Sequence, residues 1–272
     1  MAASRGGLEP AHLRALLERI REAYHRPELI HPDPLEIVRG YDDPRDREIA
    51  AVICSSLAFG RVERILVASR QVLERLDPPA QDLARTPPSR LRRRLAGFRH
   101  RFVTGEHVTA LLVGVRAVMR RRGSLEAGFL AHDRPDAPDT RAGLAGLTAE
   151  IRTGAGADPG HLLPEPCRGS ACKRLHLMLR WLVRRDAVDP GGWTDVRPAR
   201  LVVPLDVHMH RVAVALGLTA RRALDGRAAV EITRGFARLA PEDPVRWDFA
   251  LTRAGIRGEG SLAALEREGV TV

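Results

Sequence analysis

The chain has 272 residues, of which 44% are hydrophobic, so it is long enough for one large or two small domains with a sizeable core. Its formal net charge of +10 favours a polyanionic partner, nucleic acid first and an anionic membrane second, although an arginine-rich genome would raise the charge without any such function. Three irregularly spaced cysteines argue against a disulfide framework, a metal centre or an iron–sulfur cluster, and the absence of a long apolar run argues against a membrane span or signal peptide.

Apolar residues recur at helical spacing along most of the chain, and no convincing strand alternation is present. Asp46 is a suitable cap for the second predicted helix. The predicted helices cover residues 11–25, 48–56, 61–76, 105–122, 124–131, 140–153, 170–183, 206–217, 226–240, 244–255 and 260–267. We therefore predict an all-α fold of about ten helices of ordinary length.

The densest basic stretch runs from Pro87 to Arg101, with Phe98 and Phe102 among the arginines. Basic side chains with aromatics between them suit a phosphate backbone and a stacked base. A solvated helix face would have the same composition, so both interpretations stay open.

Lys173 is the only lysine in the chain, in which every other long basic side chain is arginine. A desolvated lysine can lose its proton and attack carbon, whereas an arginine stays charged. The alternative is a chance surface lysine. Just before it, Arg168 to Cys172 predicts a tight turn, in which Gly169 allows close approach to a ligand and the following helix start favours a phosphate.

Asp206 stands between two apolar segments, residues 201–205 and 212–217. We expect partial desolvation to raise the pKa of this carboxyl, which would suit proton transfer. The alternative is that Asp206 only caps the helix that follows it.

The segment from Pro204 to Ala213, read with Lys173 upstream, resembles the helix-hairpin-helix DNA glycosylase superfamily and within it the 8-oxoguanine glycosylase/AP lyases. Residues 53–56 with 61–65, and residues 97–102, are similar to two further segments of that family, so the resemblance covers about residues 30–255. The chain departs from the family pattern in its hairpin, which lacks Leu-Pro-Gly-Val-Gly, and in the spacing of lysine and aspartate. Leu57 to Phe59 also replace an asparagine-rich patch, which leaves the choice of opposite base open.

The resemblance implies a single unit over residues 1–272 with two helical lobes. The central lobe would cover about residues 45–165. The second lobe, residues 166–255, would carry Lys173 and Asp206, with the N-terminal helices packed on it. Because the N-terminus lacks an apolar signal core, we expect a cytoplasmic protein, associated with the nucleoid as a monomer, without a cofactor or metal.

The implied activity is base-excision repair of double-stranded DNA that contains a damaged base, with oxidised purines such as 8-oxoguanine as the expected substrates. A flipped nucleotide would be attacked by neutral Lys173, with Asp206 stabilising the developing positive charge, and the Schiff base would permit strand cleavage. The implied DNA contacts are Arg168, Gly169, Ser170, His208, Arg99 and Arg101. The implied base pocket is Trp247, Asp248 and Phe249, for which core packing is the alternative.

Three other functions compete with this one. The first is a protein of the same fold that binds DNA structure without catalysis. The second is a Schiff-base enzyme acting on a small metabolite, and the third is a basic, membrane-associated regulator. The repair function requires Lys173 and Asp206 to lie side by side where an extruded sugar can reach both.

Overall fold

The computed structural model describes residues 9–256, and this part of the chain is mainly helical, which confirms the all-α prediction. The helices are α1 (Pro10–Tyr24), α2 (Leu35–Val38), α3 (Pro44–Ser56), α4 (Val62–Leu73), α5 (Pro79–Arg85), α6 (Pro88–Arg94), α7 (Gly105–Arg122), α8 (Leu125–Leu130), α9 (Arg141–Ala155), α10 (Lys173–Val183), α11 (Val207–Ala215), α12 (Gly226–Ala237) and α13 (Asp248–Ile256). Among these residues the single sheet pairs β1 (Arg99–His100) with β2 (Val103–Thr104) in antiparallel register.

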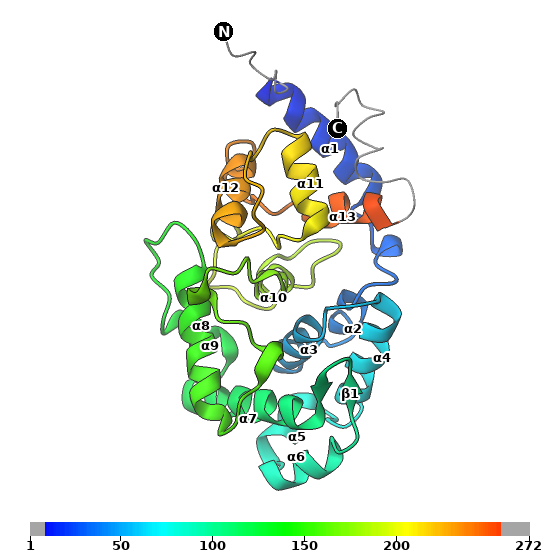
Figure 1. The fold of residues 1–272 in the computed structure, drawn as a ribbon, viewed down its shortest axis with the longest axis vertical. Helices are drawn as coiled ribbons and strands as arrows, with labels where there is room; N and C mark the ends of the chain where they lie inside the picture. Colours follow the sequence, from blue (N-terminus) through cyan, green and yellow to red (C-terminus); the bar gives the residue numbers. More distant parts are fainter. Residues whose placement is uncertain (1–8, 257–272) are drawn as a thin grey trace.

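Helix α10 lies between two groups of helices (Figure 1). Helices α2 to α9 form one group, and α1 with α11, α12 and α13 forms the other. Helix α10 packs against α3, while α13 packs against both α1 and α11. One continuous hydrophobic core runs through both groups. Because α10 lies between them in this core, contacts from both groups fix the position of its side chains.

Helices α7 and α9 pack closely in the first group and approach one another most tightly at Gly114. A Cβ atom at Gly114 would lie 2.2 Å from the Ile151 carbonyl oxygen, so only glycine permits this approach. The two helices bury Leu111, Val115, Leu144 and Leu147 between and around them.

Several predicted boundaries move for identifiable reasons. Asp43, not Asp46, caps α3, because Pro44 takes the first helical position; the Asp46 carboxylate instead accepts from the Ala80 amide at 2.7 Å. The helix predicted from residue 170 begins at Lys173, because Cys172 has a left-handed backbone with φ 44°. Three short helices, α2, α5 and α6, and the β1–β2 hairpin were not predicted. The helix predicted over 260–267 lies outside the described residues.

Over residues 9–256, no helix combines the length and the apolar character that crossing a bilayer requires.

Candidate active site

Lys173 is the first residue of α10, and the backbone before it makes a sharp turn. Gly169 has φ 80° and Cys172 has φ 44°, so two left-handed residues reverse the chain within four positions. No side chain of a described residue caps the α10 N terminus. The first backbone amides of this helix are therefore available to an anion next to the Lys173 amine.

The turn before Lys173 is fastened to the start of α12. The Gly226 amide donates to the Gly169 carbonyl at 2.9 Å, and Ser170 forms an isolated antiparallel bridge with Asp225. The predicted phosphate contacts Arg168, Gly169 and Ser170 are all exposed on this turn. The guanidinium of Arg168 pairs with Glu165 at 3.1 Å.

Asp206 is placed by α11, which it caps. Its Oδ1 accepts from the Met209 amide at 2.9 Å, and its Oδ2 accepts from Lys173 Nζ at 2.7 Å. The lysine side chain is 38% exposed and the aspartate side chain 24% exposed. The amine and the carboxylate are thus adjacent and both reachable from solvent, as amine chemistry on an outside substrate requires.

The predicted direction of the Asp206 pKa shift is wrong. Burial does raise the pKa of this carboxyl, but the Lys173 ammonium, the Met209 amide and the nearby His208 together hold the pKa below its ordinary value. Asp206 is therefore ionised at neutral pH, so it can accept a proton but has none to donate.

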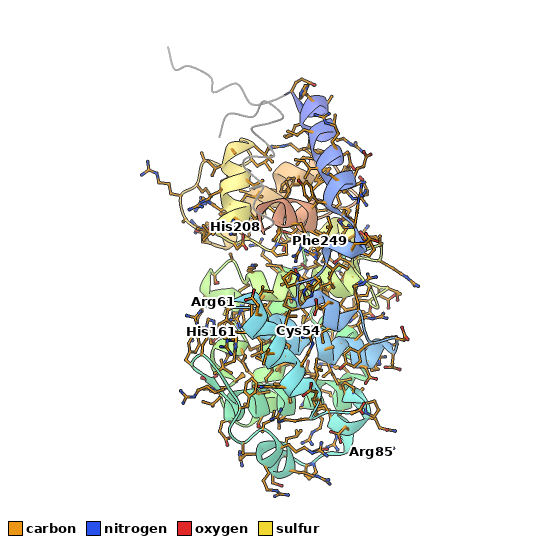
Figure 2. All side chains as sticks on the ribbon, turned by 90° about the vertical axis from the view of Figure 1, so that its right-hand side faces the viewer. Cys54, Arg61, Arg85, His161, His208 and Phe249 are labelled. Carbon is orange, nitrogen blue, oxygen red and sulfur yellow. The ribbon has the colours of Figure 1, made fainter. Side chains whose placement is uncertain are left out.

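The Lys173–Asp206 pair opens on a cavity of about 330 Å³ between the two helix groups. Figure 2 shows His208 and Phe249 on one side of the gap between the groups and Arg61 on the other. The lining residues are Asp33, Pro34, Ala58, Phe59, Gly60, Val62, Ile65, Lys173, Leu177, Arg180, Pro204, Asp206, His208, Asp248, Phe249 and Thr252. A volume of this size, lined by both apolar and charged side chains, is typical of a site for a small molecule.

The far wall of the cavity is held to α10 by buried ion pairs. Arg180 pairs with Asp248 at 2.5 Å and with Asp189 at 3.0 Å, and all three side chains are at most 5% exposed. Burial alone would lower the pKa of Arg180, but the two carboxylates raise it, so the guanidinium stays charged. Burial raises the pKa of Asp248 even though Arg180 opposes the shift.

The structure separates the three residues predicted for a base pocket. Asp248 and Phe249 line the cavity, whereas Trp247 does not. Trp247 is 1% exposed, packs against Phe236 with ring centroids 5.6 Å apart, and donates from Nε1 to Glu18 at 3.2 Å. Trp247 is therefore a core residue. Phe249 is only 2% exposed, so it supports the wall without offering a free ring face.

An aromatic cluster at the cavity rim joins Phe102, which the sequence marked as a possible stacking residue, to Phe59 and His161, which the prediction missed. Phe59 stacks on Phe102 with centroids 5.4 Å apart, and His161 packs edge-on against both rings. Arg174 lies over the Phe59 ring at 5.3 Å and donates to the Ser56 and His161 carbonyls; burial lowers its pKa to about 10. Phe102 is 57% exposed, which makes it the most exposed large apolar side chain among the described residues.

The hairpin β1–β2 explains why Phe102 is exposed and where the two predicted arginines lie. Arg101, with φ 55°, and Phe102 form its tip, while Phe98 turns into the core. The Arg101 side chain lies against Gly60, which lines the cavity. Arg99 is exposed on β1 and forms no ion pair with a described residue. The structure thus places Arg101, but not Arg99, beside the cavity.

The fold and the site define a helical protein with a lysine–aspartate pair at the mouth of an interlobe cavity. Residues 33–257 match the model of the family described as "Protein of unknown function (DUF2400)", and the chain belongs to this family. No curated protein and no solved structure matches the chain. The matched range contains every residue that lines the cavity.

Proposed function

We propose that this protein is a DNA N-glycosylase with AP lyase activity that acts on a damaged base, with oxidised purines as the first candidates. The observation that carries the proposal is the 2.7 Å contact between Lys173 Nζ and Asp206 Oδ2 beside a cavity of about 330 Å³. An amine is the one nucleophile in this cavity that forms a Schiff base with a sugar, and Lys173 is the only lysine in the chain.

In the proposed reaction the Lys173 nitrogen bonds to the anomeric carbon of a flipped nucleotide. The bond between that carbon and the base breaks, and its electron pair leaves with the base. Before the attack the Lys173 ammonium loses one proton, which ends on the departing base. The bond between the anomeric carbon and the ring oxygen then breaks as the carbon–nitrogen double bond forms. A second proton passes from the nitrogen to the opened ring oxygen, and the protonated Schiff base keeps the third. Asp206, ionised and adjacent, is the acceptor that relays the two transferred protons and ends the step as a carboxylate.

The surroundings of the pair support DNA as the substrate. The uncapped α10 N terminus and the exposed turn Arg168–Ser170 offer amides and a positive charge to phosphates next to the target nucleotide. The Phe59–Phe102 stack at the rim offers an exposed aromatic ring to an unpaired base. His208 lines the same cavity from the first turn of α11.

The test is borohydride trapping on duplexes that carry a panel of damaged bases. Wild-type protein is expected to form a covalent adduct with at least one duplex, and Lys173→Gln none, while both bind the same DNA. Lys173→Arg keeps the charge without the nucleophile, so it should also give no adduct. An adduct that persists in Lys173→Gln removes this residue from the mechanism.

The second candidate is a protein of this fold that binds DNA structure without chemistry. The double role of Asp206, which both caps α11 and pairs with Lys173, favours it, because a purely structural ion pair would have this geometry. Wild-type protein that binds duplex DNA with no adduct and no released base across the panel would establish this function instead.

A further inference from the structure

A second concave site lies on α12, away from the lysine–aspartate pair. Its volume is about 630 Å³, and it shares no lining residue with the first cavity. It is lined by Arg141, Gly217, Leu218, Thr219, Ala220, Arg227, Val230, Glu231, Arg234 and Arg238. The lining holds four arginines and one carboxylate, and one of the arginines, Arg141, pairs with Asp139 at 2.9 Å, so three arginine charges give the site its positive character.

Three of these arginines form a stripe along one helix. Arg227, Arg234 and Arg238, which we call the arginine stripe, follow one another at intervals of seven and four residues, so they share a face of α12 and its C-terminal cap. Their guanidinium groups have no ion-pair or hydrogen-bond partner among residues 9–256. The one carboxylate in the site, Glu231, accepts a hydrogen bond from the Thr219 hydroxyl at 2.9 Å.

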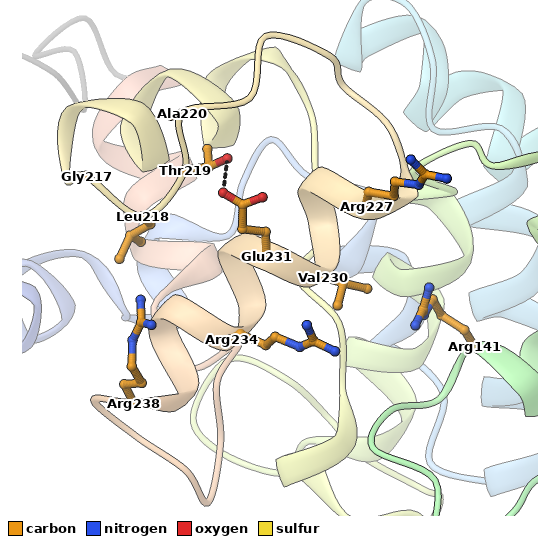
Figure 3. A pocket seen from close by; sticks show the side chains of 10 residues that line it. All are labelled: Arg141, Gly217, Leu218, Thr219, Ala220, Arg227, Val230, Glu231, Arg234 and Arg238. Carbon is orange, nitrogen blue, oxygen red and sulfur yellow. Dashed lines mark hydrogen bonds between the residues drawn. The ribbon is translucent and has the colours of Figure 1, made fainter.

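The guanidinium groups spread along the site. Figure 3 shows Arg141, Arg227 and Arg234 around Val230, with Arg238 at the other end beside Leu218. At about 1.5 Å of rise per residue, the stripe extends over roughly 16 Å of helix. One strand of a DNA duplex carries a charge every 3.4 Å or so along the axis, so an extended phosphate chain can meet all three arginines, while a compact anion reaches only part of the stripe.

The lining is suited to phosphates and not to bases. Its apolar members are small aliphatic side chains such as Leu218 and Val230, and no aromatic ring is among them. A nucleobase would find no stacking partner there. The ligand chemistry is therefore that of a backbone, recognised by charge and not by sequence.

The stripe starts next to the candidate active site. Gly226, which precedes Arg227, donates its amide to the Gly169 carbonyl at 2.9 Å, in the turn that leads to Lys173. From there α12 carries the arginines away from the turn. Arg227 directly follows the residue that is hydrogen-bonded to the exposed Gly169–Ser170 turn.

We infer that the arginine stripe binds the phosphate backbone of DNA outside the nucleotide held at Lys173. The inference rests on the proposed DNA-binding function but not on its chemistry. The stripe contributes affinity and salt dependence, while Lys173 and Asp206 remain the reacting groups.

The test compares two triple variants of equal charge change on an undamaged duplex of about 24 base pairs at roughly 50 to 200 mM salt. In the first, Arg227→Gln, Arg234→Gln and Arg238→Gln remove the stripe. In the control, Arg14→Gln, Arg85→Gln and Arg120→Gln remove three exposed arginines of α1, α5 and α7, outside the basic stretch Pro87–Arg101; Figure 2 labels Arg85 at the opposite end of the molecule from α12. All six side chains are exposed, so both variants should fold, and thermal melting checks this.

The stripe variant is expected to bind at least about tenfold more weakly, with a salt slope lower by two to three units or so, because each phosphate contact contributes about 0.9. The control variant should keep the wild-type slope. If both variants lose the same affinity and salt slope, the effect comes from the total charge of the protein and the inference is overturned. A stripe variant with wild-type affinity for DNA would also overturn the inference. This holds even if calorimetry shows that the variant no longer binds inorganic tripolyphosphate.

A separate measurement distinguishes this inference from the proposed chemistry. The stripe variant at saturating DNA should still form whatever borohydride adduct the wild type forms. If the stripe variant forms the adduct and binds DNA with unchanged affinity, the proposed reaction is supported and the DNA-binding role of the stripe is contradicted. If the salt slope depends on the stripe but the wild type forms no adduct, the DNA-binding role of the stripe is supported and the proposed reaction is contradicted.

Discussion

Arg180 joins the helix that carries Lys173 to the helix that walls the cavity, because its Nη1 donates to Asp248 Oδ2 at 2.5 Å. The same guanidinium donates to Asp189 at 3.1 and 3.0 Å. Arg184, the residue that follows the last residue of α10, pairs with Asp189, Asp186 and Asp243. The amine is thus held in place from the opposite end of its own helix.

Removing Arg180 should therefore destabilise the fold. In Arg180→Met, Asp248 stays buried without its cation and Asp189 keeps only Arg184, so we expect the free energy of unfolding to fall by about 3 to 5 kcal/mol. Urea denaturation measures the change. The control is Arg92→Met, whose partner Glu106 is 65% exposed and whose own side chain is 58% exposed, so its loss should cost less than about 1 kcal/mol. Similar losses for the two variants would contradict the role given to Arg180.

Asp206→Asn separates the two functions of this residue. The amide oxygen can still accept from the Met209 amide, so we expect a change in unfolding free energy below about 1 kcal/mol. The proton acceptor is lost, so the rate of adduct formation should fall by about two to four orders of magnitude. Asp225→Asn is the matched control, since Asp225 caps α12 through the Ala228 amide in the same way. A comparable loss of rate in that control would point to capping, and not to proton transfer.

Phe102→Ala should weaken DNA binding without weakening the fold. The ring is 57% exposed and stacked on Phe59, and stacking on an unpaired base contributes about 1 to 3 kcal/mol, or roughly 5- to 150-fold in affinity. Fluorescence anisotropy on a duplex with one unpaired base measures the effect. Val67→Ala removes another exposed apolar side chain, 47% exposed on α4, and should leave the affinity unchanged. If both variants bind like the wild type, the rim cluster is not a DNA contact.

His176 should make the fold sensitive to mild acid. It is buried on α10, where burial lowers its pKa to about 4, and its Nδ1 has no hydrogen-bond partner among the described residues. In the unfolded chain the imidazole keeps its ordinary pKa near 6.5, so the unfolded chain takes up a proton more readily than the folded protein does. The contribution of neutral His176 to the free energy of unfolding is therefore fully present above about pH 6.5. It is lost as the pH falls toward 4, and the total loss is roughly 3 kcal/mol.

Unfolding measured between about pH 4 and 7 checks this dependence. His176→Met removes the titrating group and should flatten the curve in this range. His12→Met, at an exposed position of α1, is the control and should keep the wild-type curve. A His176→Met curve as steep as that of the wild type would assign the acid sensitivity elsewhere.

Local sequence signals predicted the long helices well. The helix expected over residues 105–122 is α7 at the same bounds, because Thr104 closes a capping box at one end and Gly123, with φ 88°, ends the other. Asp206 caps α11 as its sequence position allows. The short proline-led helices α5 and α6 bury few residues each, so their periodicity is too brief to recognise.

The cavity itself depends on contacts that no local pattern contains. Asp33, Phe59 and Thr252 meet there from three distant segments. Trp247 and Phe249 are close in sequence, yet one faces Phe236 in the core and the other faces the cavity, because the orientation of α13 is set by its packing on α1 and α11. The sign of the Asp206 pKa shift likewise required the position of Lys173, which sequence spacing alone does not supply.

Helix α1 precedes the stretch that defines the family, which begins at residue 33, yet it reaches across to the end of that stretch. Glu18 accepts from Trp247 Nε1 and pairs with Arg246 at 3.3 Å, and His25 stands edge-on against Phe249 at 5.7 Å. A fragment cut at the family boundary would bare these rings to water and loosen the wall on which Asp248 sits. The part of the chain that matches the family model is therefore shorter than the part that packs into one core, and the second includes α1.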